Sequence, residues 1–369
     1  MRHLTLPFLL GMSLALAQVA LASAGGGIRT ESPGVPPPET PLPEPTPAIE
    51  PRKLGSRIAQ PVKITPDGCC AYPAWSADGE WVLFVDRPGE GAPAGLYSVP
   101  ASGGVVDLVT ERLGVFSSDW SLVAYPAGAI TYVERWADGQ RWSVPSGGRE
   151  IHFSPDASKI AWRVGTKGIR FPDRRQRAIW ISNLDGSEPR ELITVHGGEF
   201  LGWLGNEHML VSGRLAPPDP AAVWRVSVKD GAALRLMEIE RPRGVAISPS
   251  GSWIALTLAF DPQPGRNGLW VLKSDGTFQE RFPVYGSYRW RADGQLLLMP
   301  MEMSQPNPAL WQWNPETGDI WELAGADRVE LPIESNDWQV SPGGRRLVFR
   351  SSVDGALYLL QIPGTPDAP

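Results

Sequence analysis

FSPDASKIAW, residues Phe153–Trp162, is the clearest copy of a pattern that recurs along most of this 369-residue chain. A full copy begins with an aromatic or aliphatic residue, followed in order by a serine, any residue, and an Asp or Gly. A turn and then a hydrophobic strand come next. Successive copies lie 37–50 residues apart, a period typical of architectures that repeat one supersecondary unit. The seven copies begin at Trp75, Phe116, Phe153, Trp203, Ile247, Trp290 and Val340.

A second hairpin signal follows the first in each of the earlier repeats. Pairs such as Asp185-Gly186 separate further hydrophobic stretches, and both positions of such a pair tolerate the positive φ of a tight turn. Two hairpins per repeat make four antiparallel strands, and the 16 Trp suit packing between neighbouring sheets. We therefore predict an all-β fold, a seven-bladed β-propeller of four-stranded antiparallel blades. Six or eight blades are the alternatives, because the second repeat is compressed and the fourth copy is degenerate.

The last repeat is one strand short. After Leu357–Leu360 only a short polar tail remains, whereas residues 57–64 precede the first copy and have no blade of their own. An unpaired sheet edge between the first and last blades would be a liability. We predict that residues 57–64 supply the missing strand and close the ring.

The N-terminus has the features of an export signal. Arg2 and His3 precede an apolar run from Leu4 to Ala22, and Ala22-Ser23-Ala24 has the small-residue spacing of a cleavage site. We predict a signal peptide at 1–24, a proline-rich disordered linker at 25–54 and a propeller domain at 55–369. The protein would then be periplasmic or secreted. An uncleaved N-terminal anchor is the alternative, and the only membrane contact we expect.

Composition limits the chemistry. A net charge of −6 argues against nucleic acid as a partner, since phosphate binding needs a basic face. We find no Cys cluster, metal-binding motif or phosphate loop, so we predict no cofactor and no metal, and we assign no catalytic residue. The motif Asp residues are expected to build turns, because Asp hydrogen-bonds its own backbone there. His152 is a candidate residue of the central channel, with a structural role as its alternative.

Cys69 and Cys70 are the only two cysteines, and they are adjacent. In an oxidising compartment they could form a disulfide with each other, pair between chains, or stay buried as thiols. Neighbouring Cα atoms are about 3.8 Å apart, shorter than the usual disulfide separation, so a bond between them would be easily reduced. We treat the pair as a candidate disulfide or redox site.

Loop lengths indicate where a partner would bind. The turns inside the hairpins share one face of the disc, here called the hairpin face, while the loops between hairpins and between blades share the other, the loop face. Four inter-hairpin loops are long, and long loops on a rigid scaffold commonly carry function. The first of them is basic and is a candidate binding loop for an acidic partner or glycan. Its basic residues are Lys167, Arg170, Arg174, Arg175 and Arg177.

The motif at Phe153–Trp162 resembles the repeat of TolB-like propellers and related WD40-like (PD40-type) repeats of exported bacterial proteins. It also resembles the propeller half of prolyl-oligopeptidase-type enzymes. The chain lacks both the TolB α/β domain and a hydrolase domain with its G-x-S-x-G motif, so neither activity is carried over. We expect a monomeric, non-catalytic scaffold or binding module for an envelope protein or glycan. The alternative is a propeller enzyme, a lyase or quinoprotein, with its site in the central channel.

Overall fold

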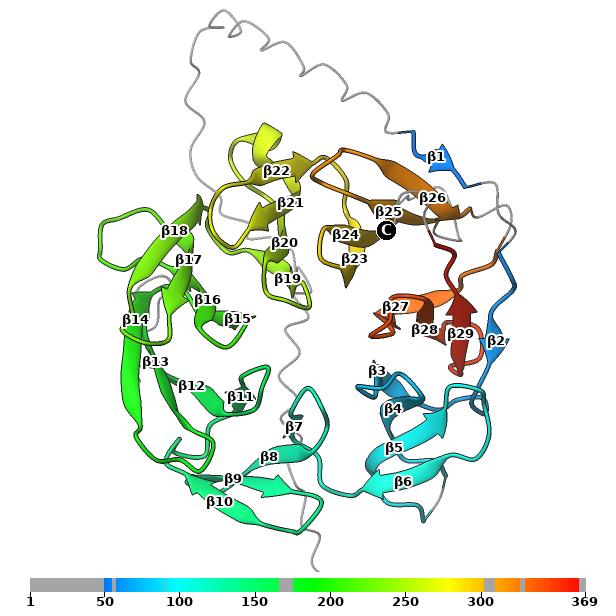
Figure 1. Ribbon diagram of the computed structural model, residues 1–369, viewed down its shortest axis with the longest axis horizontal. Helices are drawn as coiled ribbons and strands as arrows, with labels where there is room; N and C mark the ends of the chain where they lie inside the picture. The colour runs from blue at the N-terminus through cyan, green and yellow to red at the C-terminus, as the bar shows by residue number, and fades with distance from the viewer. Residues whose placement is uncertain are drawn as a thin grey trace, which may run out of the picture. The chain divides into compact units, whose positions relative to one another are not determined.

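Seven four-stranded antiparallel units form a closed ring in the computed structural model (Figure 1). The structure describes residues 50–54, 58–89, 91–165, 175–301, 309–325 and 329–364. Within that part of the chain the only helix is a single 3₁₀ turn, η2 (Pro264–Arg266). The predicted all-β class and the seven four-stranded antiparallel blades are confirmed.

The first four blades follow the chain without a crossover, each from its innermost to its outermost strand. Blade two is the most compact, because Gly128 and Ala129 alone join its second and third strands. The strands are β3 (Ala71–Trp75), β4 (Trp81–Asp86), β5 (Gly95–Pro100), β6 (Asp107–Thr110), β7 (Val115–Phe116), β8 (Leu122–Ala127), β9 (Ile130–Arg135), β10 (Arg141–Val144), β11 (Ile151–Phe153), β12 (Lys159–Gly165), β13 (Gln176–Asn183), β14 (Arg190–His196), β15 (Phe200–Leu204), β16 (His208–Gly213), β17 (Ala222–Ser227) and β18 (Ala233–Glu238).

The last three blades complete the ring and receive two strands from the N-terminal end of the described chain. Those two strands are β1 (Arg52–Lys53) and β2 (Val62–Lys63). The others are β19 (Arg243–Ile247), β20 (Trp253–Leu258), β21 (Gly268–Lys273), β22 (Gln279–Phe282), β23 (Gly286–Ala292), β24 (Gln295–Pro300), β25 (Leu310–Trp313), β26 (Ile320–Ala324), β27 (Ile333–Val340), β28 (Arg346–Ser351) and β29 (Leu357–Gln361).

The repeated Ser and Asp build the first turn of the blade, as the sequence predicts. In blade one the Ser76 hydroxyl accepts the backbone N–H of Trp81 (2.9 Å), and Asp78 Oδ1 accepts the N–H of Glu80 (2.9 Å). The Ser76 hydroxyl also donates to Asp78, and together with the Glu80 N–H it holds the pKa of Asp78 below its usual range. Asp119 and Asp156 accept the N–H two residues on in the same way, so these three carboxylates are occupied by their own turns, whereas Asp293 accepts the Ser250 N–H of the preceding blade (3.3 Å).

Tryptophans connect neighbouring blades near the channel. The Trp290 indole N–H of blade six donates to the carbonyl of Ala246 in blade five (3.1 Å), so a buried donor and a backbone acceptor satisfy each other. In each such bond the indole of one blade donates to the preceding blade. The large tryptophan rings also fill the space between the two sheets. The other inter-blade indole bonds are Trp75 to Gln339 O, Trp120 to Trp75 O, Trp203 to His152 O and Trp338 to Ser287 Oγ.

The ring is closed by β2, which pairs antiparallel with β29 as the fourth strand of blade seven. The predicted role of the 57–64 segment is thus confirmed at Val62 and Lys63. Just after β2, Ile64 is buried in a hydrophobic cluster between blades seven and one, and its N–H donates to the Leu357 carbonyl (2.9 Å). We call residues 62–65 with their partners on β29 the seam.

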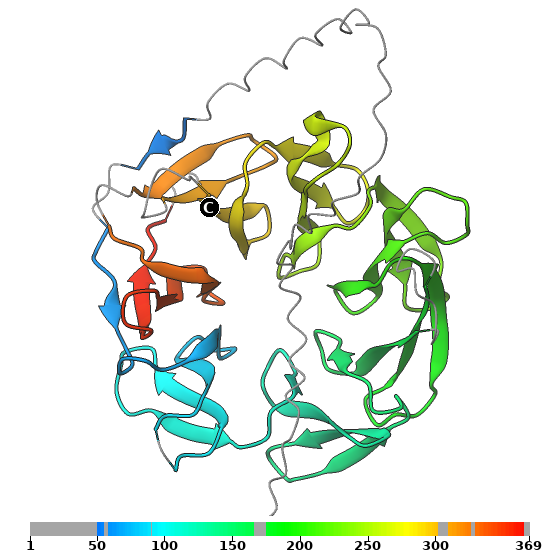
Figure 2. The same ribbon diagram turned by 180° about the vertical axis from the view of Figure 1, so that it is seen from behind.

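One strand was not predicted. β1 lies within the proline-rich range 25–54 but pairs in parallel with β26 on the outer edge of blade six. Leu54 follows it and is buried in the cluster between blades six and seven. Figures 1 and 2 show β1 and β2 in blue along the outer rim of these two blades. The predicted signal peptide and residues 25–49 of the linker lie outside the described residues.

Candidate functional site

A pocket of about 470 Å³ opens between blades three and four. Its walls come from the start of β12, the end of β13 and the start of β14 in blade three, and from the β15–β16 turn and the end of β17 in blade four. These segments all lie on the hairpin face, opposite the long loops. The volume falls within the range of small-molecule sites, roughly 300–1,000 Å³.

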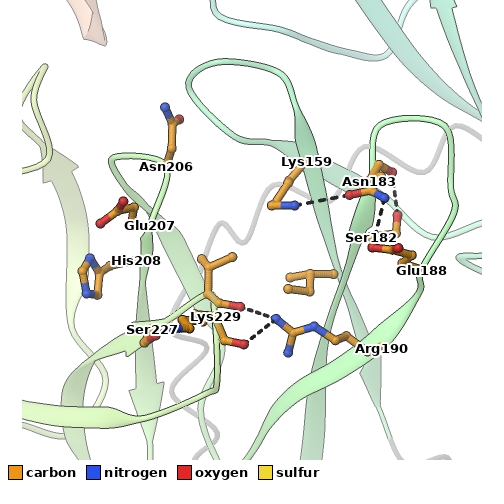
Figure 3. Close-up of a pocket in the computed structure, with 12 residues that line it drawn as sticks. Lys159, Ser182, Asn183, Glu188, Arg190, Asn206, Glu207, His208, Ser227 and Lys229 are labelled. Atoms are coloured by element: carbon orange, nitrogen blue, oxygen red, sulfur yellow. Dashed lines mark hydrogen bonds between the residues drawn. The ribbon is translucent and has the colours of Figure 1, made fainter.

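Figure 3 shows polar side chains converging on this pocket from both blades. Arg190 is committed to the fold, because its guanidinium donates to the carbonyls of Val228 and Lys229 (3.1 Å to the latter) and so ties blade three to blade four. Lys159 Nζ donates to Asn183 Oδ1 at 3.3 Å. The side chains of Glu207, His208 and Lys229 have no hydrogen-bond partner among the described residues, which leaves them available to a ligand.

The pocket is locally more positive than the chain as a whole. Three cationic side chains, Lys159, Arg190 and Lys229, face two carboxylates, Glu188 and Glu207. His208 does not add to the positive charge at neutral pH, because burial and the neighbouring Arg225 lower the pKa of its imidazole. Its ring can therefore both donate and accept a hydrogen bond there.

Sequence reasoning did not find this pocket, but one signal was present. In the fourth copy of the motif, Leu204 replaces the serine and Asn206 the aspartate. Asn206 consequently serves the neighbouring blade instead of its own turn, since its Oδ1 accepts the backbone N–H of Asp156 (3.1 Å). The departure from the repeat marks the place where blade four contributes Asn206, Glu207 and His208 to the pocket.

The central channel has a cavity of its own, about 520 Å³, against the innermost strands of blades five to seven. Its polar lining includes Arg289, Asn336 and Gln339. Arg289 lies over the Trp338 ring (5.1 Å) and donates to the Asn336 carbonyl (3.1 Å); burial lowers the pKa of its guanidinium. Within the described residues this cavity has no histidine or carboxylate in its wall.

His152 lies on β11, the innermost strand of blade three, and lines neither cavity. Its ring packs against Phe200 with centroids 5.0 Å apart, and its carbonyl accepts the Trp203 indole. Burial lowers the pKa of the imidazole, with Glu150 opposing and Arg163 reinforcing the shift. The ring therefore sits neutral between two blades.

Only the end of the predicted basic loop lies within the described residues. Lys167, Arg170 and Arg174 lie outside the described residues, while Arg175 and Arg177 lie at the base of the loop. The Arg177 guanidinium donates to Glu199 Oε2 (3.1 Å), and it shares this carboxylate oxygen with Arg163 (3.2 Å).

Cys69 and Cys70 form a disulfide in the structure, the first of the three states considered from the sequence. Both residues are buried in the cluster between blades seven and one. A disulfide sulfur carries no hydrogen, so the Thr65 hydroxyl donates to Cys69 Sγ (3.0 Å) while accepting the Leu357 N–H (2.8 Å). The pair therefore lies directly against the seam.

The loop face carries exposed apolar side chains over blades five and six. Phe260 is 88% exposed and Met301 is 74% exposed, and Tyr285 is also exposed beside Met301, whose N–H donates to the Tyr285 carbonyl (2.8 Å). Phe260 also adopts a positive φ of 65°, unusual for a residue with a large side chain.

The described residues contain no helix that is long and apolar enough to cross a bilayer.

Comparison with solved structures supports the fold. An oligogalacturonate lyase in complex with manganese matches with a TM-score of 0.60 at 14% identity over 83% of this chain and 96% of that one. The β-propeller domain of the Trilobed protease from Pyrococcus furiosus matches with a TM-score of 0.54 at 14% identity, covering 82% and 100%. That domain is described as having an open velcro topology, whereas here β2 closes the ring.

A TolB structure from Agrobacterium tumefaciens matches at 15% identity over 82% of this chain and 92% of that one, with a TM-score of only 0.38. No family model and no curated protein matches the sequence. At 14% identity the lyase and protease matches support the propeller fold and no activity, and the seven blades of this chain place it in the class of seven-bladed β-propellers. Within that class this chain is a seam-closed propeller with a polar pocket between two blades, and its TolB-like repeat remains a sequence resemblance.

Proposed function

We propose that this chain is an exported binding module of the cell envelope and that it takes up a glycan in the pocket between blades three and four. The observation that carries the proposal is the set of uncommitted polar groups, Glu207, His208 and Lys229, in a pocket of ligand size. Carboxylate, imidazole and ammonium groups are suited to the closely spaced hydroxyls of a sugar, which both donate and accept.

The charge balance of the pocket favours an acidic sugar over a neutral one. Lys159 and Lys229 supply charge-assisted hydrogen bonds to a sugar carboxylate, while Glu207 and neutral His208 serve hydroxyls. The rigid turns that carry these groups belong to two blades joined by Arg190, so little ordering is needed on binding.

A glycan array containing neutral, amino and uronic-acid oligosaccharides tests this proposal directly. We expect uronic-acid glycans to bind, and Lys229→Ala and Glu207→Gln each to weaken binding by roughly 10- to 100-fold, the cost of one charge-assisted hydrogen bond. Glu238→Gln is the matched control, because it removes an exposed carboxylate on β18 of the same blade, away from the pocket. Binding that both pocket variants leave intact, or no binding on the array, would contradict the proposal.

A second candidate function is contact with an envelope protein through the loop face. Phe260, Tyr285 and Met301 support it, because exposed large apolar side chains on one face commonly mark protein interaction sites. Cross-linking in native envelopes with a photoreactive residue at position 260 tests this idea. A partner is expected from position 260 and not from position 105, where Val105 is 71% exposed in the β5–β6 turn on the hairpin face. Equal cross-linking from both positions would count against the loop face.

A further inference from the structure

Asp86 at the end of β4 lies beside the cysteine pair because of the strand register. β3 and β4 are antiparallel and Ala71 pairs with Val85, so the residues next along each strand, Cys70 and Asp86, are brought together at the same edge. A carboxylate oxygen of Asp86 and the two sulfur atoms all lie within 4.8 Å of one another.

The carboxylate is incompletely satisfied. Asp86 Oδ1 accepts the backbone N–H of Arg87 (2.6 Å). Asp86 Oδ2 is buried and is reached by no hydrogen-bond donor from the part of the chain that the structure describes. A buried acceptor without a partner is costly, about 1–3 kcal/mol, and a redox role, a water or an ion at the group can account for it.

We propose that the disulfide is the oxidised form of a metal site, and that the reduced chain binds one thiophilic divalent cation, Zn²⁺ or Cd²⁺, through Cys69, Cys70 and Asp86. Thiolate sulfur with one carboxylate oxygen is a donor set suited to these ions, which bind sulfur at about 2.3 Å and carboxylate oxygen at about 2.0–2.2 Å. Such distances place neighbouring donor atoms about 3–4 Å apart, so the carboxylate is already near its position and the sulfurs separate when their bond breaks.

The reduction is a thiol–disulfide exchange with an external dithiol. The dithiol gives up two electrons and two protons and becomes a cyclic disulfide, while the Cys69–Cys70 bond breaks into two thiols. Binding of the cation then displaces the two thiol protons, and Asp86 Oδ2 gains its missing partner. The Thr65 hydroxyl, 3.0 Å from Cys69 Sγ and 3.8 Å from Cys70 Sγ, is placed to donate to the bound thiolates.

The test uses the full chain in two redox states. The protein is reduced with a dithiol, freed of reductant without air, equilibrated with Zn²⁺ or Cd²⁺, and measured for bound metal by mass spectrometry and for the ultraviolet absorption of cadmium thiolate. We expect one extra ion per reduced chain compared with the oxidised chain, and no extra Mg²⁺. The oxidised wild type measures the metal bound at histidines elsewhere in the chain. This comparison uses the wild type alone, so it does not depend on whether a variant folds.

Two matched variants separate the site from simple thiol chemistry. Asp86→Asn should weaken Cd²⁺ binding at least about tenfold, since even loss of an outer hydrogen-bond partner typically costs 10- to 100-fold. Asp107→Asn removes an exposed carboxylate from the outer strand of the same blade and should have no effect. The proposal is overturned if the reduced wild type retains no more metal than the oxidised protein, or if Asp86→Asn binds as tightly as the wild type.

Discussion

Truncation of Ile64 to Ala should weaken the closed ring by removing a buried side chain from between blades seven and one. Ile64 is 5% exposed and packs with Val348, Leu357 and Leu359 of blade seven and with the first blade. Replacing a buried Ile by Ala removes its transfer free energy and leaves a cavity, which costs about 2–5 kcal/mol. The backbone bond from Ile64 N–H to the Leu357 carbonyl survives the substitution, so the loss comes from packing alone.

Val62→Ala is the internal control, because Val62 lies two residues away on β2 and is 62% exposed. It should change the free energy of unfolding by no more than about 0.5 kcal/mol. Urea unfolding followed by the fluorescence of the 16 Trp measures both variants, with the midpoint and slope fitted separately. If Ile64→Ala and Val62→Ala shift the midpoint equally, the seam does not depend on the buried face of this segment and the reasoning fails.

Two more predictions concern the seam and the inter-blade bonds. The hydrogen bond from Lys63 holds the pKa of the Asp354 carboxyl well below its usual range, so the stabilisation is complete above about pH 4 and disappears as pH falls through the lowered pKa. In an acid titration followed by circular dichroism, the wild type should therefore lose stability more steeply with falling pH than Asp354→Asn. Parallel unfolding curves for the two proteins would refute this linkage. Trp290→Phe removes the indole donor to Ala246 and should cost about 1–3 kcal/mol in urea unfolding. Trp81→Phe, at an exposed ring with no indole bond among the described contacts, should cost less, and equal losses would exclude the inter-blade bond as the cause.

The repeat could be predicted because each blade carries its own local signals. Ser76 and Asp78 serve the turn in which they occur, so their function is visible in a stretch of six residues. The seam could be predicted by counting, because the final blade was one strand short. β1 could not, since Arg52–Lys53 has no apolar alternation and pairs only because β26 offers a free edge.

The candidate sites depend on contacts between blades, which no local pattern records. Lys159 and Glu207 belong to different repeats and meet in one pocket because the ring places blades three and four side by side. Asp86 ends β4 and Cys70 immediately precedes β3 of the same blade, and their proximity follows from the register of these two strands, which the sequence does not state. The sequence shows that the two cysteines are adjacent, but only the pairing of β3 with β4 shows that the Asp86 carboxylate lies beside them.

The order in which β1 and β2 attach has a mechanical consequence. Any pull on the chain before Arg52 reaches the ring first through the two-residue pairing of β1 with β26, on blade six. That pairing and the buried Leu54 that follows it would have to detach before load reached β2, the strand that joins blades seven and one. Detachment of β1 would then lengthen the chain ahead of the ring, so that a force applied at the N-terminal end of a tethered propeller would not at once open the ring.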